Sequence, residues 1–317
     1  MDKPKMLWLG IDCLDYNAVK KFNTNLPNLW ALMQKSTWGR LESKKPLYTA
    51  SCWSSIFTST QPETHGVTWA KWKEGEVGFD SIKVITMFDV LNRNGYTCGL
   101  FNMPATFPIR DINKWIVAGF PAVGEKEEIA KPVDILNDLP SDFISYTPGH
   151  MLTNREMTED FDLWVKSETK MRNAFIGLPY KYKSVDLIAY GSTVVDRCTH
   201  LKGVNHKTFA LKFYRAADTS IGQIIEAIKP DYTFITSDHG ADGVCHSLNG
   251  FILLNGARFK ENNEIDTKQI NFAPTVLELL GLNIPSTMEG QIIWEAFKSP
   301  AIDKEKIKQQ LKALGYI

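Results

Sequence analysis

Short apolar runs alternate with longer amphipathic segments along most of the chain, a pattern typical of an α/β fold. Apolar runs bounded by turn residues predict strands at 5–12, 96–104, 186–192, 232–238 and 250–256. Apolar residues spaced three and four apart predict helices at 26–36, 49–60, 87–95, 207–228, 273–281 and 304–315. The alternation therefore predicts an α/β core that is built from both ends of the chain.

Residues 121–183 interrupt this alternation, which resumes after them. The segment has few strand signals, several prolines and charges of both signs, but it keeps aromatic residues that could pack, such as Phe143 and Trp164. We therefore interpret it as an inserted cap rather than a linker. The predicted organisation is a core formed by 1–120 and 184–317, with 121–183 as the cap.

The composition narrows the class of protein. Of the 317 residues 44% are hydrophobic, enough for one large domain with a modest insertion. Lys and Arg number 36, as do Asp and Glu, so we expect no stable nucleic-acid complex and no membrane association. No apolar run is long enough to span a bilayer, and "MDKPKMLWLGID" lacks a signal-peptide core and cleavage site. We expect a cytoplasmic protein, and no oligomeric state follows from the sequence.

Acidic and imidazole side chains stand where two predicted strands end. Asp12 follows "LWLGI", and Asp238 and His239 follow "FIT". In parallel α/β sheets, ligands gather at the carboxyl ends of strands, where loops from several strands converge. An isolated acid at a strand end is often only a helix cap. For Asp12 by itself, capping and ligation therefore stay equally open.

Further candidate ligands lie in two other segments. Asp196 and His200 are four residues apart in "STVVDRCTHL", so a helix there would place both on one face. A surface ion pair would have the same spacing, and His246, on its own, could be a solvated loop residue. The five cysteines form no CxxC motif. Aspartate and histidine without thiolates suit zinc or manganese, and two such ions could clamp a displacement at phosphorus.

Thr49 stands at the predicted start of the helix in "PLYTASCWSSIFTSTQPETHGVTW". Free backbone N–H groups and the helix dipole favour an anion at such a position. A threonine there is usually a helix cap. As a nucleophile, its hydroxyl would need a nearby metal to lower its pKa.

Six segments in this order carry a family resemblance: "GID", "YTASCWSSIFTSTQPETHG", "DRCTH", "SDHG", "HSLNG" and "APTVLELLGLNIPSTMEG". They resemble the alkaline phosphatase superfamily, and within it the type I phosphodiesterase / nucleotide pyrophosphatase branch, over about 5–120 and 185–292. The resemblance implies an alkaline-phosphatase-like α/β fold, with a mostly parallel central sheet, helices on both faces and a small inserted cap. The core would be catalytic, and the cap would select the substrate.

The resemblance also implies two divalent metal ions, with zinc as the first choice and manganese as the alternative. The positions that match the family's metal ligands are Asp196, His200 and His246 for one ion, and Asp12, Thr49, Asp238 and His239 for the other. Thr49 also occupies the position of the nucleophile, sixteen residues before His65. His65 would be a structural residue of its turn. Asp242 has no family role and is interpreted as a loop residue.

The implied function is hydrolysis of a phosphodiester or nucleotide pyrophosphate bond in a small-molecule substrate, through a phosphothreonine. A phosphomonoesterase, a phosphonate hydrolase and an inactive metal-stabilised binding protein are the alternatives. The sequence lacks the C-x-P-x-R or S-x-P-x-R segment of sulfatases after Thr49, which disfavours that activity. Ala70 stands near the position of the family's phosphate-binding asparagine. Lys71 and Asn102 are the candidate replacements.

Overall fold

The computed structural model describes residues 3–68, 78–112, 114–119, 122, 128–140, 161–200, 206–243 and 245–298. Its strands are β1 (Met6–Ile11), β2 (Thr37–Glu42), β3 (Cys98–Met103), β4 (Trp115–Ala118), β5 (Ala130–Lys131), β6 (Leu187–Ser192), β7 (Tyr232–Thr236), β8 (Gly240–Asp242), β9 (Cys245–Ser247), β10 (Asn249–Gly256) and β11 (Asn263–Lys268). Nine of them form one sheet in the order β11-β2-β10-β7-β1-β6-β3-β4-β5, and β8 pairs with β9 in a short hairpin.

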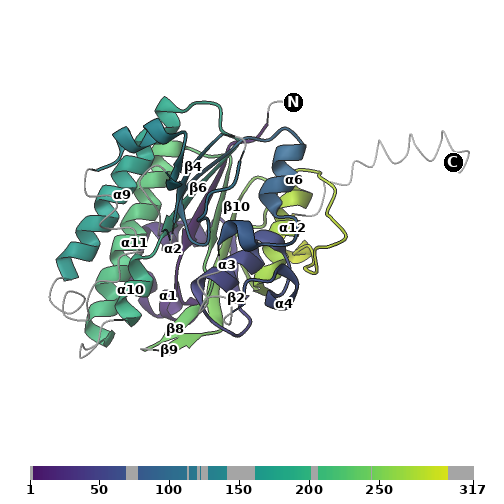
Figure 1. Ribbon diagram of the computed structural model, residues 1–317. Helices are drawn as coiled ribbons and strands as arrows, with labels where there is room; N and C mark the ends of the chain where they lie inside the picture. The colour runs from purple at the N-terminus through teal and green to yellow at the C-terminus, as the bar shows by residue number, and fades with distance from the viewer. Residues whose placement is uncertain are drawn as a thin grey trace, which may run out of the picture.

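Helices cover both faces of this sheet (Figure 1). The α-helices are α1 (Tyr16–Phe22), α2 (Pro27–Met33), α3 (Thr49–Thr58), α4 (Pro62–His65), α6 (Met87–Arg93), α9 (Phe161–Lys181), α10 (Val194–Thr199), α11 (His206–Ile228) and α12 (Phe272–Leu279). Short 3₁₀ helices are η1 (Asn23–Asn25), η2 (Phe79–Ser81), η4 (Val133–Asp138), η5 (Gln269–Asn271) and η6 (Trp294–Ala296). One layer contains α9, α10 and α11, and the opposite layer contains α3, α6 and α12.

The sheet is mostly parallel, as predicted. β1 pairs in parallel with β6 and β7, β3 with β4 and β6, and β11 with β2. β10 runs antiparallel to both β2 and β7, and β5 runs antiparallel to β4. Because two antiparallel steps separate β7 from β2, these strands point the same way. The carboxyl ends of β1, β6, β7, β2 and β11 therefore lie along one edge.

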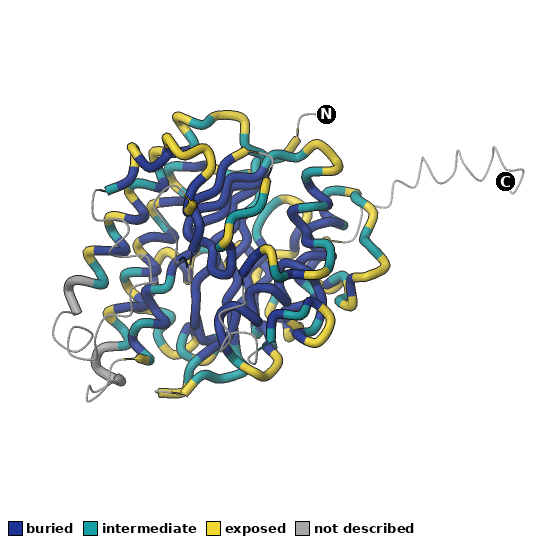
Figure 2. The backbone as a smooth tube through the Cα atoms, viewed as in Figure 1, coloured by how far each residue is buried: buried dark blue, intermediate teal, exposed yellow. Residues whose placement is uncertain are grey.

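Each face of the sheet has its own hydrophobic core. Along β1, Leu7 and Leu9 face one core while Met6 and Trp8 face the other, and all four side chains are fully buried. Successive side chains of a strand point to opposite faces of the sheet. A strand that is buried on both faces therefore has an unbroken run of apolar residues in the sequence. Burial of each such side chain stabilises the fold by roughly 1.5–3 kcal/mol. Figure 2 shows the buried strands in the centre, with exposed residues on the outer helices and loops.

The described parts of 121–183 differ from the predicted cap. β5 is an edge strand of the main sheet, and α9 packs against α11 and β6. Its Phe175 ring lies 5.7 Å from the Phe101 ring and 5.0 Å from the Tyr190 ring, measured between centroids. The sequence hid this helix because charged residues surround its apolar stripe of Met171, Phe175 and Leu178.

Residues 128–140 and 161–183 thus belong to the core layers, which corrects the predicted domain boundary for them. Residues 141–160 lie outside the described ranges, so a substrate-selecting role for that part of the segment stays a prediction. The predicted helix at 304–315 also lies outside them. In the described part of the chain, no helix is both long and apolar enough to cross a membrane.

Candidate metal centre

The chain turns sharply after β1, and this turn holds Asp12 at the carboxyl edge of the sheet. The Asp12 amide donates to the Ser192 carbonyl over 2.8 Å, and the Cys13 amide donates to Asp238 Oδ1 over 3.2 Å. The helix-capping role that was left open for Asp12 belongs instead to Asp15, whose side chain accepts the Ala18 amide at the start of α1. Asp12 is therefore free for another function.

The first ligand cluster joins the ends of β1 and β7. Asp12, Asp238 and His239 are completely buried or nearly so, and each offers a ligand atom within 4.8 Å of the others. His239 Nε2 lies 3.3 Å from Asp238 Oδ2 and 3.8 Å from Asp12 Oδ1. In the described part of the chain, none of these three atoms has a hydrogen-bond partner. Three unpaired polar atoms that converge at zero exposure form a site for a cation.

The second cluster joins α10 to the β8–β9 hairpin. His200 Nε2 lies 3.2 Å from Asp196 Oδ2, and His246 Nε2 lies 3.3 Å from Asp196 Oδ1. Helical geometry thus places Asp196 and His200 on one face, as predicted, although His200 itself is the residue after the last turn. Burial alone would raise the pKa of Asp196, but hydrogen bonds from the two histidines hold it well below its usual range.

Backbone carbonyls set the tautomers of two histidines. His239 Nδ1 is 3.2 Å from the Gly240 carbonyl, and His246 Nδ1 is 3.2 Å from the Leu47 carbonyl. Because a carbonyl can only accept, each Nδ1 carries a proton, and Nε2, which faces the carboxylates, is the ring nitrogen that could bind a metal ion once it holds no proton. The two imidazole rings stack with centroids 4.0 Å apart, so the two clusters are neighbours.

The electrostatics of the clusters fit a divalent cation. Burial, followed by repulsion from Asp238 and Asp196, raises the pKa of Asp12 well above its usual value. Burial is also the main cause of the raised pKa of Asp238. Carboxylate oxygens and imidazole nitrogens together are ligands of zinc and similar ions, and a cation would compensate these buried charges.

Thr49 is the first residue of α3, and the residue is buried, with 8% of its surface exposed. The residue before the helix is Tyr48, so the alternative that Thr49 caps it is wrong. The first backbone bond of the helix comes from the Ser51 amide, which leaves the Thr49 and Ala50 amides directed beyond its N-terminus. The carbonyl of Leu47, two residues earlier, accepts the bond from His246, so this helix end adjoins the second cluster.

Two residues that sequence analysis did not single out help to build the site. Asp15 Oδ2 accepts hydrogen bonds from Ser247 Oγ (2.9 Å) and from the Ala241 amide (3.2 Å), which ties the β8–β9 hairpin to the turn after β1. A Cβ at Gly240 would lie 2.2 Å from this oxygen, so only glycine permits the approach. The Cys13 thiol lies within 4.8 Å of ring nitrogens of His239 and His246. Neither contact has a sequence signal, because both depend on the fold.

The remaining candidate residues have other positions. Asp242 ends β8 and is exposed, so it is a hairpin residue rather than a loop residue. Asn102 has a positive φ of 54°, and its amide donates to the Gly191 carbonyl over 2.9 Å. That bond occupies one of the two N–H donors of this amide. Ala70 and Lys71 lie outside the described residues.

His65 has the contacts of a structural residue, in agreement with its interpretation. It is fully buried; its Nδ1 accepts the Val67 amide over 3.1 Å, and its Nε2 therefore donates to Ser55 Oγ over 3.0 Å. Burial lowers the pKa of His65 to about 4.

We expect this histidine to make the protein less stable in acid. Between pH 6.5 and about 4, His65 is protonated in the unfolded chain but neutral in the folded protein. The free energy of unfolding therefore decreases as the pH falls, by up to about 3 kcal/mol. Urea titrations of wild type and His65→Gln at several pH values measure this effect. The difference between the two proteins should shrink toward pH 4, and a difference that is constant over this range would contradict the assignment.

A family model described as type I phosphodiesterase / nucleotide pyrophosphatase matches residues 6–286 of the chain. Among curated proteins, the chain is similar to a 2,3-bisphosphoglycerate-independent phosphoglycerate mutase of Vibrio vulnificus (strain YJ016), with 33% identity over 101 residues. That match covers 26% of this chain and 19% of the mutase, so the chain spans only about a fifth of that relative. The family match agrees with the resemblance in the motifs.

Two solved structures extend the comparison to the fold. Murine ectonucleotide pyrophosphatase / phosphodiesterase 5 superposes with a TM-score of 0.60 and 10% identity, over 89% of this chain and 96% of that one. A phosphonate monoester hydrolase from Silicibacter pomeroyi superposes with a TM-score of 0.61 and 12% identity, over 95% of this chain and 78% of that one. At such low identities, the similarity concerns the fold alone.

Proposed function

The chain belongs to the type I phosphodiesterase / nucleotide pyrophosphatase family of metal-dependent phosphoesterases, and from this premise we propose that it hydrolyses phosphodiester or nucleotide pyrophosphate bonds in a small-molecule substrate. The observation that carries the proposal is the meeting of two Asp/His clusters beside the N-terminus of α3. A binding protein would not need a threonine hydroxyl at that place as well. The site therefore has the parts for displacement at phosphorus.

Two divalent ions fit the two clusters, with zinc as the first choice and manganese as the alternative. One would be held by Asp196, His200 and His246, and the other by Asp12, Asp238, His239 and Thr49. When bound, such ions would lower the pKa of hydroxyl groups in the site and neutralise charge on the phosphate oxygens.

The chain's own residues supply the nucleophile and part of the phosphate site. The Thr49 hydroxyl loses its proton to solvent as Oγ1 attacks phosphorus; the Oγ1–P bond forms, the bond from phosphorus to the leaving oxygen breaks, and that oxygen takes up a proton from solvent. The Thr49 and Ala50 amides at the N-terminus of α3 face developing negative charge on the phosphate. Water then cleaves the phosphothreonine and regenerates the hydroxyl.

The alternative activity on the same residues is hydrolysis of a phosphomonoester or a phosphonate. The fold similarity to a phosphonate monoester hydrolase over 95% of this chain is compatible with this alternative. Parallel rate measurements on a bis-aryl phosphate, a mono-aryl phosphate and an aryl phosphonate distinguish the three. A protein that binds metal and nucleotides but turns over none of these substrates would be the inactive binding protein.

Metal removal tests the proposal directly. We expect purified protein, stripped by chelation, to lose hydrolysis of bis-p-nitrophenyl phosphate and to regain it with zinc or manganese. Activity that survives complete metal removal would contradict a metal-dependent reaction. Binding of two ions without activity on any aryl ester would instead favour the binding protein.

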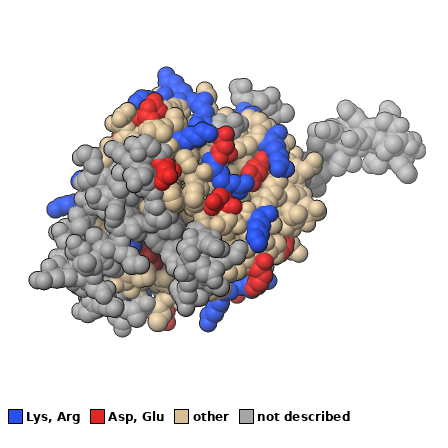
Figure 3. Space-filling model, in the orientation of Figure 1, with Lys and Arg blue, Asp and Glu red and all other residues tan. Residues whose placement is uncertain are grey.

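We also propose a cellular location and a class of binding partner for the protein. Cys13, Cys52, Cys98 and Cys198 are buried free thiols, which suits a cytoplasmic location. On the face shown in Figure 3, basic and acidic side chains of the described residues are interspersed. A mixed surface of this kind supports a small-molecule partner, with no nucleic acid and no membrane.

A further inference from the structure

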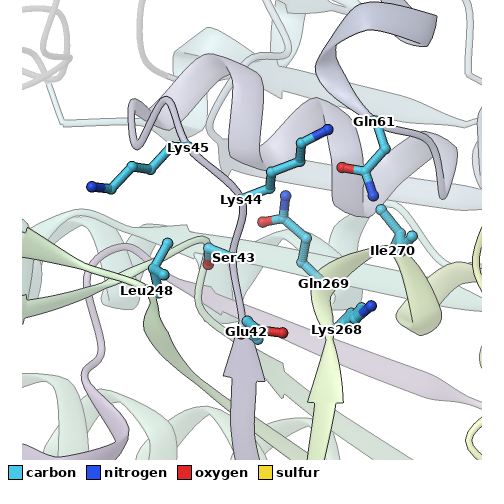
Figure 4. A pocket seen from close by; sticks show the side chains of 9 residues that line it. All are labelled: Glu42, Ser43, Lys44, Lys45, Gln61, Leu248, Lys268, Gln269 and Ile270. Carbon is cyan, nitrogen blue, oxygen red and sulfur yellow. The ribbon is translucent and has the colours of Figure 1, made fainter.

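A cavity of about 280 Å³ opens beside the candidate metal centre and takes no part in it (Figure 4). Its walls come from the ends of β2 and β11, the segment that leads to α3, and Leu248 after the hairpin. The space is large enough for one charged group and part of the chain that carries it. Its lining side chains determine which chemical group it would recognise.

The lining carries an excess of positive charge. Lys44, Lys45 and Lys268 contribute three ammonium groups, against the one carboxylate of Glu42. Lys44 pairs with Glu63 at 3.1 Å, outside the cavity lining. For Lys45 and Lys268, no ion pair occurs within the described ranges. The cavity thus has at least two ammonium groups available to an anion.

The side-chain amide of Gln269 adds hydrogen-bonding groups to the cavity lining. Gln269 is 2% exposed, and neither its Oε1 nor its Nε2 has a hydrogen-bond partner in the described part of the chain. Figure 4 shows this side chain rising from the end of β11 toward Lys44 and Gln61. A buried amide without partners costs free energy, which a ligand with polar oxygens would recover. An oxygen-rich anion therefore matches the lining in both charge and hydrogen bonding.

The cavity and the metal centre share one edge of the sheet. β2 lies two strands from β7, and β11 lies three strands from it. At the usual spacing between strands, the cavity is roughly 10–15 Å from the Asp238 cluster. The wall between them is the segment 43–47, in which Ser43 Oγ donates to the Asp238 carbonyl and the Leu47 carbonyl accepts from His246. One extended small molecule could reach both places.

We propose that this cavity binds a second anionic group, a carboxylate or phosphate, of the same substrate whose phosphodiester is cleaved at the metal centre. The inference rests on the proposed function and narrows it to diesters with a distal negative charge. Such a group enters between Lys45 and Lys268 and reaches the Gln269 amide. The same lining chemistry would also accept free inorganic phosphate, which the test must separate.

The test compares two diesters that differ in one charge. One is the p-nitrophenyl phosphodiester of a long-chain hydroxy acid, and the other is its carboxylate methyl ester. We expect wild-type protein to have a higher kcat/KM for the acid. Lys45→Gln and Lys268→Gln should each lower the acid-to-ester ratio by about fivefold, the upper range for an exposed ion pair. Lys183→Gln, an exposed lysine before β6 without an ion pair in the described residues, is the matched control and should leave the ratio unchanged.

Chain length and free phosphate distinguish the two sources of the anion. Shortening the hydroxy acid so that it cannot span the distance should abolish the preference for the acid. Inorganic phosphate that changes the rates of both diesters equally, with no preference for the tethered acid, would overturn the proposal in favour of a separate anion site. An acid-to-ester ratio near one in wild type, or a ratio unaffected by both lysine variants, would also overturn it.

Binding to the full-length, metal-loaded Thr49→Ala protein separates this inference from the proposed reaction. Calorimetry should show tighter binding of the acid than of the ester, and Lys45→Gln with Lys268→Gln should remove the difference. If wild type hydrolyses neither diester but this difference persists, the reaction fails while the cavity assignment stands. If both diesters are hydrolysed with equal kcat/KM and bind equally, the reaction stands and the cavity assignment fails.

Discussion

Replacing Thr49 by alanine is expected to lower kcat for phosphodiester hydrolysis by about 10³-fold or more, as removal of a covalent nucleophile does in other enzymes. Thr49 is the first residue of α3 and adjoins the second ligand cluster through the neighbouring Leu47 carbonyl. Steady-state rates on bis-p-nitrophenyl phosphate, with zinc or manganese present, measure the effect.

Two controls separate loss of chemistry from loss of structure. Thr49→Ser keeps a hydroxyl at the same position and should retain a substantial part of the activity, while it loses one methyl group. The alanine variant should keep the thermal stability of metal-free wild type, because Tyr48 and not Thr49 occupies the N-cap position of α3. Full retention of kcat in Thr49→Ala would exclude Thr49 as the nucleophile and would leave water as the attacking group.

The core of the fold was predictable because its signals are local. β1 is apolar throughout, since it is buried on both faces, and α11 (His206–Ile228) repeats its apolar residues over many turns. β2 and β11 were missed for the opposite reason. Their strands, "TWGRLE" and "NEIDTK", carry charged residues on an exposed face near the edge of the sheet. Such strands form because neighbours pair with them, which no local pattern reveals.

The candidate ligands were predictable from strand ends and helical spacing, but their surroundings were not. Asp12, Asp196 and Asp238 come from segments more than forty residues apart, and only the strand order β7-β1-β6 makes them neighbours. Asp15 belongs to no sequence motif that would predict its contact with Ser247. The cavity at Lys268 and Gln269 depends on β11, a strand that the sequence did not predict. Long-range pairing therefore limits what the sequence alone can show.

Replacing Asp12 by asparagine is expected to change stability in opposite directions with and without metal. Asp12 and Asp238 are both fully buried, and burial and mutual repulsion raise the pKa of Asp12. In metal-free protein, Asp12→Asn removes one of two crowded carboxylates and should stabilise the fold by roughly 1–3 kcal/mol. With metal, wild type should gain about 4 kcal/mol at a free ion concentration 1,000 times the Kd, and the variant should gain much less.

The pH dependence of stability provides a second test of the Asp12 prediction. Because the pKa of Asp12 is raised in the folded protein, metal-free wild type binds more protons than its unfolded chain above about pH 4, so its stability falls as the pH rises. Asp12→Asn should remove much of that fall. Asp242→Asn, on the exposed end of β8, is the matched control and should change neither curve. Thermal unfolding with and without zinc measures both effects. If Asp12→Asn destabilises the metal-free protein and keeps the full stabilisation by zinc, then Asp12 stabilises the fold and does not bind a cation. The metal ligands would then be the histidines and Asp196.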